Sequence, residues 1–282
     1  MDYTTFTMEL MELLQKMIEE DTEIRLEKVP KNNGIVLDGI IFLKKGCRTS
    51  PVLYVQDYYE FWKMGISMEQ LVEKIIWSFE QYENDMQIPQ DYFLDYEKLR
   101  PRIFFKMISY QKNEELLKEI PHRRILDLAM VFYHHPEHVP ATVLIQNNHL
   151  RMWGISEELL ELDARKNTYV CLPAEFVPMR EVVGPQGENS PMYVITNEER
   201  RFGAGVIFYP GVLEEAARLF RKDFFIIPSS IHECILMPDD GKSSQEELCC
   251  LVEEINEYCV EPREVLSDRA YSYRLKDGCI HL

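Results

Sequence analysis

Hydrophobic residues near the N-terminus recur every three or four positions, as they do on one face of a helix. Phe6, Leu10 and Leu14 belong to this series, which predicts an amphipathic helix that ends at the acidic run 19–21. Apolar and polar residues then alternate, as is typical of β-strands. Lys31-Asn32-Asn33-Gly34 is the strongest hairpin signal in the chain. The expected elements are strands at 22–29, 34–45 and 51–56, followed by helices at 58–65 and 67–82.

Residues 84–101 are mixed and polar, and they predict a boundary between two lobes. The first lobe, residues 1–90, would hold one helix, three strands and two further helices. The second lobe is residues 91–282. Its first half is expected to contain strands at 103–110 and 124–133, a helix at 113–120, a strand that passes into a helix near Gln146, a helix at 155–167 and an irregular Pro-rich segment at 173–191.

The densest apolar run of the chain, residues 201–238, lies at the centre of the second lobe. The ββαββαββ core expected over residues 192–282 contains a strand at 203–209 paired with 192–197, a helix at 212–221, strands at 224–227 and 231–237, a capped helix near 244–259 and a hairpin turning at 276–278. The fold class is therefore α+β, with two packed lobes of mostly antiparallel sheets covered by helices.

A compact set of polar residues interrupts this apolar run at Ser229, Ser230, His232 and Glu233. A turn at the two serines could supply a nucleophile or bind a substrate, or the serines could satisfy local backbone groups. In a strand that starts before them, His232 and Glu233 would face opposite sides, so they cannot form a direct acid–base pair. A structural Glu233 is expected to need backbone donors or a buried cation as partner.

Composition narrows the functional classes. The chain has 282 residues and a net charge of −17, which argues against direct nucleic-acid binding. Such an acidic surface favours solubility, a basic protein partner or mimicry of a nucleic-acid backbone. The small basic clusters His122-Arg123-Arg124 and Arg200-Arg201 are interpreted as solvated turns rather than phosphate sites. The seven cysteines form no disulfide pattern, and the chain shows neither a signal peptide nor a membrane span, so a cytoplasmic protein is expected.

Metal and cofactor motifs are incomplete. His134, His135 and His138 are weak candidates for metal ligands, but Pro136 interrupts them and no second cluster completes a four-ligand set. Neither the zinc-peptidase pattern at His232 nor a phosphate-binding glycine loop is complete. We therefore expect no metal and no cofactor. Asp268 is expected to cap or pin the last strand.

Three segments, IIFLKKGCRTSPVLYVQDYYEFWKMG, the stretch from Gly203 to Leu236, and LSDRAYSYRL, carry a resemblance over nearly the whole chain. They resemble an uncharacterised domain-of-unknown-function family of gut Gram-positive (Firmicutes) bacteria. The resemblance implies a bacterial cytoplasmic protein and no catalytic assignment.

The function expected from these observations is that of a non-catalytic, acidic protein that binds another macromolecule. A relation to mobile elements or phage is included in this expectation. The alternative is a hydrolase or small-molecule enzyme centred on the turn 229–233. A pocket at that turn, with a second acid near His232, would favour the enzyme.

Overall fold

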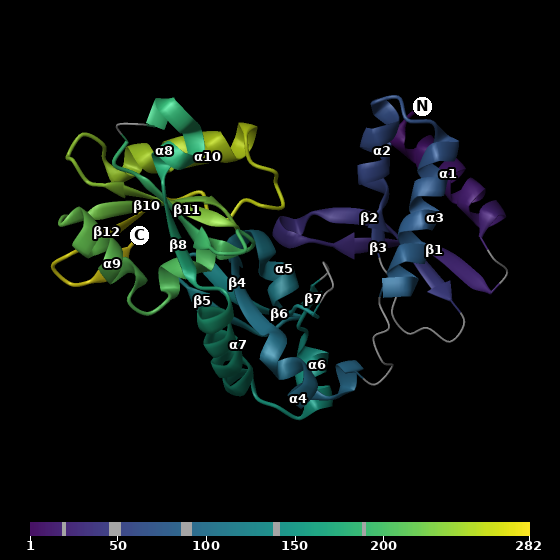
Figure 1. The fold of residues 1–282 in the computed structure, drawn as a ribbon, viewed down its shortest axis with the longest axis horizontal. Coiled ribbons are helices and arrows are strands. Elements are labelled where there is room, and N and C mark those ends of the chain that lie inside the picture. The colour runs from purple at the N-terminus through teal and green to yellow at the C-terminus, as the bar shows by residue number, and fades with distance from the viewer. Residues whose placement is uncertain (19–20, 45–51, 86–91, 138–141, 188–189) are drawn as a thin grey trace. The chain divides into compact units, whose positions relative to one another are not determined.

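A computed structural model describes residues 1–18, 21–44, 52–85, 92–137, 142–187 and 190–282 (Figure 1). The chain forms two compact units. The first contains residues 1–31 and 35–93, and the second contains residues 32–34 and 94–282. The sheets of both units are antiparallel, which confirms the α+β class.

The first unit packs three helices on a three-stranded sheet of order β1-β2-β3. Phe6, Leu10, Phe42, Leu71 and Ile75 are among its buried core residues. The predicted hairpin is confirmed, because β1 pairs with β2 in register from Thr22 opposite Lys44 to Pro30 opposite Val36. The elements are α1 (Tyr3–Met17), β1 (Thr22–Pro30), β2 (Val36–Lys44), β3 (Val52–Tyr54), α2 (Val55–Lys63) and α3 (Met68–Asp85).

The smaller sheet of the second unit is centred on β6, all of whose residues are buried. The single strand predicted at 124–133 is instead two strands, β5 and β6, which pair with each other. The chain reverses at Leu126, whose φ of 58° lies in the left-handed region. The elements are α4 (Tyr96–Leu99), β4 (Ile103–Ser109), α5 (Glu114–Leu117), β5 (His122–Ile125), β6 (Leu128–His134), β7 (Val143–Leu144), α6 (Asn147–Trp153) and α7 (Glu157–Cys171).

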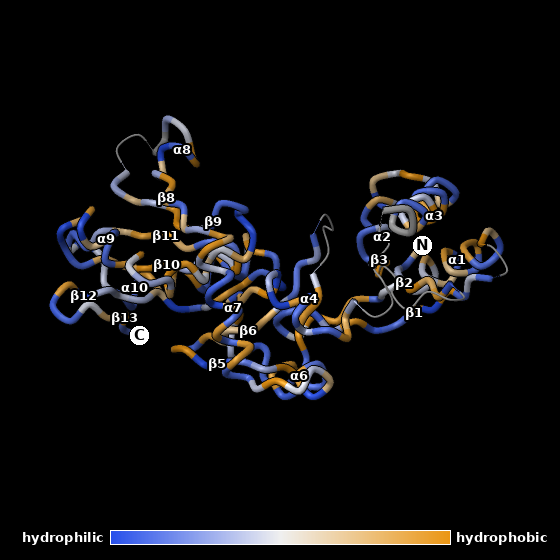
Figure 2. Tube along the Cα trace, turned by 60° about the horizontal axis from the view of Figure 1, so that its bottom comes forward, coloured by the Kyte–Doolittle hydropathy of each residue, from blue (hydrophilic) through white to orange (hydrophobic). Residues whose placement is uncertain are grey.

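The larger sheet of the second unit has the order β13-β12-β10-β11-β9-β8. Strand β10, one of its two central strands, is largely hydrophobic (Figure 2). Leu248 of α10 packs against Phe225 of this strand. The predicted hairpin at 276–278 is confirmed by the pairing of β12 with β13. The elements are β8 (Ala174–Pro178), α8 (Met179–Val183), β9 (Tyr193–Asn197), α9 (Val212–Phe220), β10 (Phe224–Ser230), β11 (Glu233–Pro238), α10 (Gln245–Tyr258), β12 (Tyr271–Arg274) and β13 (Cys279–His281).

Two predictions for this region are wrong. The segment Gly203–Phe208 is a 3-10 helix rather than a strand, and β9 pairs with β11 instead. The tight packing of two glycines explains the difference. A Cβ on Gly203 would lie 2.6 Å from the backbone nitrogen of Asn197, and one on Gly205 would lie 2.9 Å from the Phe105 ring. The segment 173–191, expected to be irregular, contains β8 and α8.

Candidate functional site

The turn between β10 and β11 contains the predicted site residues, but it is displaced from its predicted position. Strand β10 continues through Pro228 to Ser230, and β11 begins at Glu233, so the chain reverses at Ile231 and His232. The prediction of a turn at the serines is wrong because Pro228 does not end the strand. The pairing of β10 with β11 shifts register between Pro228 and Ser230, and such a bulge tolerates a residue that has no N–H.

The His232 imidazole is held by the backbone and by an aromatic ring. Its Nδ1 accepts a hydrogen bond from the backbone N–H of Phe202 at 3.0 Å, and the two rings stack with centroids 5.5 Å apart. Burial lowers the pKa of His232, which favours the neutral ring that can accept this bond. Its Nε2 lies 3.8 Å from Glu264 Oε1, beyond hydrogen-bonding distance.

The two serine hydroxyls are occupied locally. Ser230 Oγ accepts from the His232 backbone N–H at 3.0 Å, and Ser229 Oγ donates to Glu233 Oε1 at 3.4 Å. Within the part of the chain that the structure describes, neither hydroxyl is hydrogen-bonded to the His232 ring. An activated serine needs such a base within reach. The turn therefore lacks an assembled nucleophile–base pair.

The Glu233 carboxylate has a different partner from those expected. It is half-buried, and its hydrogen bond is to the Ser229 hydroxyl rather than to backbone donors. Within the described residues it forms no ion pair. The expectation that a structural Glu233 needs backbone donors or a buried cation is wrong, because its carboxylate remains partly in solvent.

Neighbouring segments clamp the turn through its backbone. Thr196 Oγ1 donates to the carbonyl oxygen of His232 at 2.8 Å, and the Ile231 N–H donates to the Glu264 carbonyl oxygen at 2.8 Å. Phe202, which donates to the imidazole, has a φ of 56°. That left-handed conformation is uncommon for an aromatic residue and persists where the surroundings fix it. These contacts fix the backbone conformation of the turn.

The histidines near Pro136 are not gathered into a cluster in the described residues. His134 is buried at the end of β6, opposite Ile103. The backbone N–H of His135 donates to the carbonyl oxygen of Arg102. Burial first, and then the charge of Arg102, lowers the pKa of His134 to about 4. His138 lies outside the described residues. Among the described ranges, no group of three His, Cys, Asp or Glu residues is arranged to hold a metal ion.

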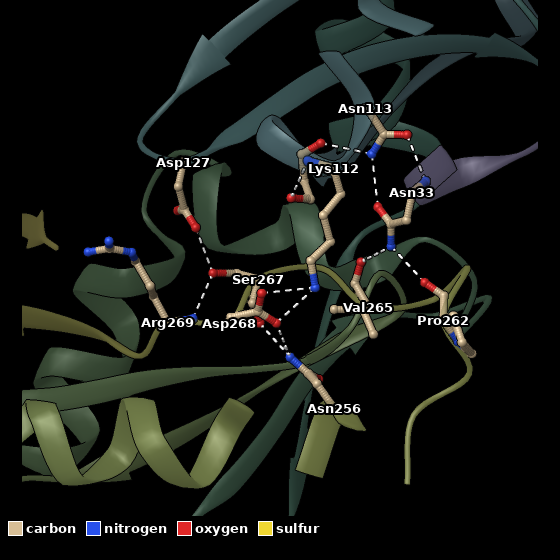
Figure 3. A network of polar contacts seen from close by, with 11 residues as sticks. Asn33, Lys112, Asn113, Asp127, Asn256, Pro262, Val265, Ser267, Asp268 and Arg269 are labelled. Carbon is tan, nitrogen blue, oxygen red and sulfur yellow. Dashed lines mark hydrogen bonds and ion pairs between the residues drawn. The ribbon is translucent and has the colours of Figure 1, made fainter. Parts of the chain in front are cut away.

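A polar network elsewhere in the second unit joins residues far apart in the sequence (Figure 3). Lys112 Nζ lies 2.9 Å from both carboxylate oxygens of Asp268, and Asn256 Nδ2 donates to Asp268 Oδ1 at 2.9 Å. Asp268 was expected to pin the last strand. Its carboxylate is held by Lys112 and Asn256, and Asn256 also donates to the carbonyl oxygen of Ser267, so these contacts tie down the segment before β12.

The same segment is tied to the turn between β5 and β6. Asp127 Oδ2 accepts from Ser267 Oγ at 2.6 Å, and Asp127 Oδ1 accepts from Tyr271 OH at 2.8 Å. Ser267 Oγ in turn accepts from the backbone N–H of Arg269. Both oxygens of the Asp127 carboxylate therefore have internal donors.

Asn33 and Asn113 form a reciprocal pair in this network. The Asn33 backbone N–H donates to Asn113 Oδ1 at 2.8 Å, and Asn113 Nδ2 donates to Asn33 Oδ1 at 2.9 Å. Asn33 Nδ2 also donates to the carbonyl oxygens of Pro262 and Val265. The left-handed φ of 60° at Asn33, which suits asparagine, places its side chain toward these partners (Figure 3).

A cavity of about 410 Å³ lies beside the network, and sequence analysis did not predict it. Its basic lining residues are Lys112, Arg124 and Arg269, and its acidic ones are Glu114, Asp127 and Asp268. The available signals were the LSDRAY segment and the cluster at 122–124. The interpretation of that cluster as a solvated turn is wrong, because its residues belong to strand β5, which pairs with β6. We name this cavity, with its lining residues Ser109–Lys112, Glu114, Arg124, Leu126, Asp127, Asp268, Arg269 and Leu282, the basic-rim pocket.

These features define an α+β protein whose described polar residues build junctions and a ligand-sized cavity rather than a recognisable catalytic motif. The chain belongs to a family of unknown function (DUF5688), whose model matches residues 3–275. No curated protein and no solved structure matches the chain. None of the described helices has the length and apolar character needed to cross a membrane.

Proposed function

We propose that this protein is a non-catalytic, cytoplasmic protein of Gram-positive bacteria that binds a basic protein partner through the outer face of α10. One observation carries the proposal: an exposed apolar stripe on α10 is flanked by carboxylates that have no basic partner among the described residues. A surface of this kind matches a partner segment with apolar anchors and lysine or arginine residues around them.

The stripe consists of Leu251, Ile255 and Tyr258, with exposed fractions of 48%, 42% and 74%. Their spacing of four and three residues places them along one side of the helix. Leu248 and Val252 of α10 are buried instead, and Leu248 packs against Phe225 of the larger sheet. The stripe is therefore not required for the core of the second unit.

The charges on α10 are of one sign. The helix carries Glu246, Glu247, Glu253, Glu254 and Glu257, and it has no lysine or arginine. Glu254 and Glu257 lie near its C-terminus, where the helix dipole disfavours negative charge by roughly 0.3–1 kcal/mol per group. Neither forms an ion pair within the described residues. A basic partner would remove this unfavourable interaction.

The alternative of a hydrolase centred on Ser229, Ser230, His232 and Glu233 has weaker support. Glu264 lies near His232, as an enzyme would require, but the serine hydroxyls are bonded to Glu233 and to the backbone. The described contacts therefore favour binding over catalysis.

Site-specific photo-crosslinking in the native host tests the proposed surface. A photoreactive phenylalanine analogue would replace Tyr258, and the matched control would carry it at Val170, which is 73% exposed on α7. The expected result is a discrete adduct with a basic protein at position 258 but not at position 170. Replacement of Glu253, Glu254 and Glu257 by glutamine should reduce the adduct several-fold. Equal crosslinking at both positions, or none at position 258, would contradict the proposal.

A further inference from the structure

We infer that the basic-rim pocket binds a small phosphate ester, with Arg124 and Arg269 as the residues that contact the phosphate. This site is separate from the α10 surface and does not depend on a protein partner. At about 410 Å³ the cavity is large enough for a small ligand.

Two of the acidic residues of the pocket already have hydrogen-bond partners within the protein, whereas its arginines retain unused donors. Asp127 accepts from Ser267 and Tyr271, and Asp268 interacts with Lys112 and Asn256. These two carboxylates are therefore already satisfied by internal donors. The donors that remain available belong to Arg124 and Arg269, and one further donor remains on Lys112.

The guanidinium group of each arginine has N–H donors that contact no described carboxylate. Arg124 Nε donates to the carbonyl oxygen of Leu126 at 3.4 Å, but its terminal nitrogens make no hydrogen bond within the described residues. The Arg269 side chain makes none there either, and Figure 3 shows its guanidinium extending away from the Lys112–Asp268 pair. A planar guanidinium matches two phosphate oxygens at once.

The guanidinium of Arg124 is oriented before any ligand arrives, and the backbone at Arg269 is fixed by a hydrogen bond. The guanidinium of Arg124 lies over the Tyr110 ring, 4.2 Å from its centroid, and Arg124 is paired with Ala129 in the smaller sheet. The Arg269 backbone N–H is bonded to Ser267 Oγ at 2.9 Å. A site whose groups are already ordered loses less conformational entropy on binding.

Lys112 and Glu114 indicate which other chemical groups the ligand carries. Lys112 uses its ammonium group on Asp268, and an ammonium has three donors, so one can still reach a phosphate oxygen. Glu114 is exposed and has no hydrogen bond or ion pair with a described residue. A carboxylate at this position suits hydroxyl groups on the ligand and repels a long polyanion. A phosphorylated sugar combines the two properties.

Isothermal titration calorimetry on the full chain tests this inference with glucose 6-phosphate, inorganic phosphate and glucose. We expect saturable binding of glucose 6-phosphate, weaker binding of phosphate and none of glucose. The double variant Arg124→Gln/Arg269→Gln should lose at least about tenfold in affinity, because two charge-assisted bidentate contacts are removed. Arg218→Gln is the matched control, since Arg218 is exposed on α9, outside the pocket.

The thermal unfolding midpoint of each variant should equal that of the wild type, so a loss of affinity reports contacts and not folding. Three results would overturn the inference. They are the absence of saturable binding by glucose 6-phosphate, equal affinity for inorganic phosphate and the ester, and equal affinity of the double variant and the Arg218→Gln control.

Discussion

The turn at 229–233 and the basic-rim pocket are both polar sites in the second unit, but they use their hydrogen-bonding groups differently. At the turn, His232 and Ser230 bond to the backbone, and the clamp from Thr196 holds the chain reversal in place. At the pocket, the carboxylates are satisfied by internal donors, whereas the donors of Arg124 and Arg269 remain available.

Whether a polar group is already hydrogen-bonded within the fold distinguishes a structural site from a binding site better than its residue type does. In the sequence, the serine, histidine and glutamate residues of this turn resemble a catalytic set. In the structure, their hydrogen-bond partners are neighbouring groups of the protein itself. Arginines that look like surface residues in a sequence line a cavity. A binding site needs groups whose capacity is not already used within the fold.

The largest effect is expected at the junction behind the turn. Gly203→Ala would place a Cβ 2.3 Å from Thr196 Oγ1, 2.6 Å from the Asn197 nitrogen and 2.7 Å from the His232 oxygen. Two of these atoms are backbone, so the clash cannot be relieved by a rotamer change. We expect a loss of at least about 3 kcal/mol in the free energy of unfolding, measured by urea denaturation.

Gly211→Ala is the matched control for this substitution. Gly211 has a φ of 82° and no atom within 4 Å of the added Cβ, so only the left-handed backbone is unfavourable, by about 1–2 kcal/mol. An equal effect of the two substitutions would contradict the tight junction at Gly203.

The pH dependence of stability should reveal the buried His134. Its pKa is lowered from 6.5 to about 4 in the folded chain, so the unfolded chain binds a proton that the folded chain does not. The associated stability is complete above pH 6.5 and is lost as the pH falls toward 4, by about 3 kcal/mol. Urea denaturation of the wild type and of His134→Gln across this range should differ in slope, with the variant flatter. Parallel curves would show that His134 is not buried in its neutral form.

Within the turn, His232→Ala should be more damaging than Glu233→Ala. Loss of the imidazole leaves the Phe202 N–H without its acceptor, which we expect to reduce the free energy of unfolding by about 2 kcal/mol. Glu233 is half-buried and accepts one long hydrogen bond from Ser229, so its removal should cost under about 0.5 kcal/mol. Thermal unfolding of both variants checks the order, and the reverse order would show that Glu233 carries the junction.

A small effect on stability, comparable to that of Glu233→Ala, is expected at the rim of the pocket. Lys112→Met breaks the pair with Asp268, but the two side chains are 36% and 40% exposed. Such a pair contributes at most about 1 kcal/mol. Differential scanning calorimetry should show a midpoint lowered by only a few degrees. A loss as large as that of Gly203→Ala would mean that the network is structural in the same sense as the turn.

Local patterns in the sequence predicted much of the fold. Asn33-Gly34 marks a hairpin through its turn chemistry, and Ser244 with Glu247 forms the expected capping box of α10. The apolar run at Gly203 was misleading, because its hydrophobic residues resemble a strand whereas its glycines pack closely against other segments. Propensity describes a residue and its neighbours in the chain, and this contact is made with Thr196, Asn197 and His232.

The candidate site depends on contacts that no local pattern contains. Lys112 and Asp268 are 156 residues apart, and Asp127 and Ser267 are 140 apart. The sequence marked both LSDRAY and the cluster at 122–124, but only the fold brings Arg124 and Arg269 to one cavity.

Chemical-shift mapping by NMR with glucose 6-phosphate tests the central distinction most directly, because it reports on the turn and the pocket in one sample. We predict shifts of the Arg124 and Arg269 side-chain and Lys112 backbone resonances that saturate with ligand, while those of His232 and Glu233 stay unchanged. Saturable shifts at His232 and Glu233, or none at Arg124 and Arg269, would contradict the account.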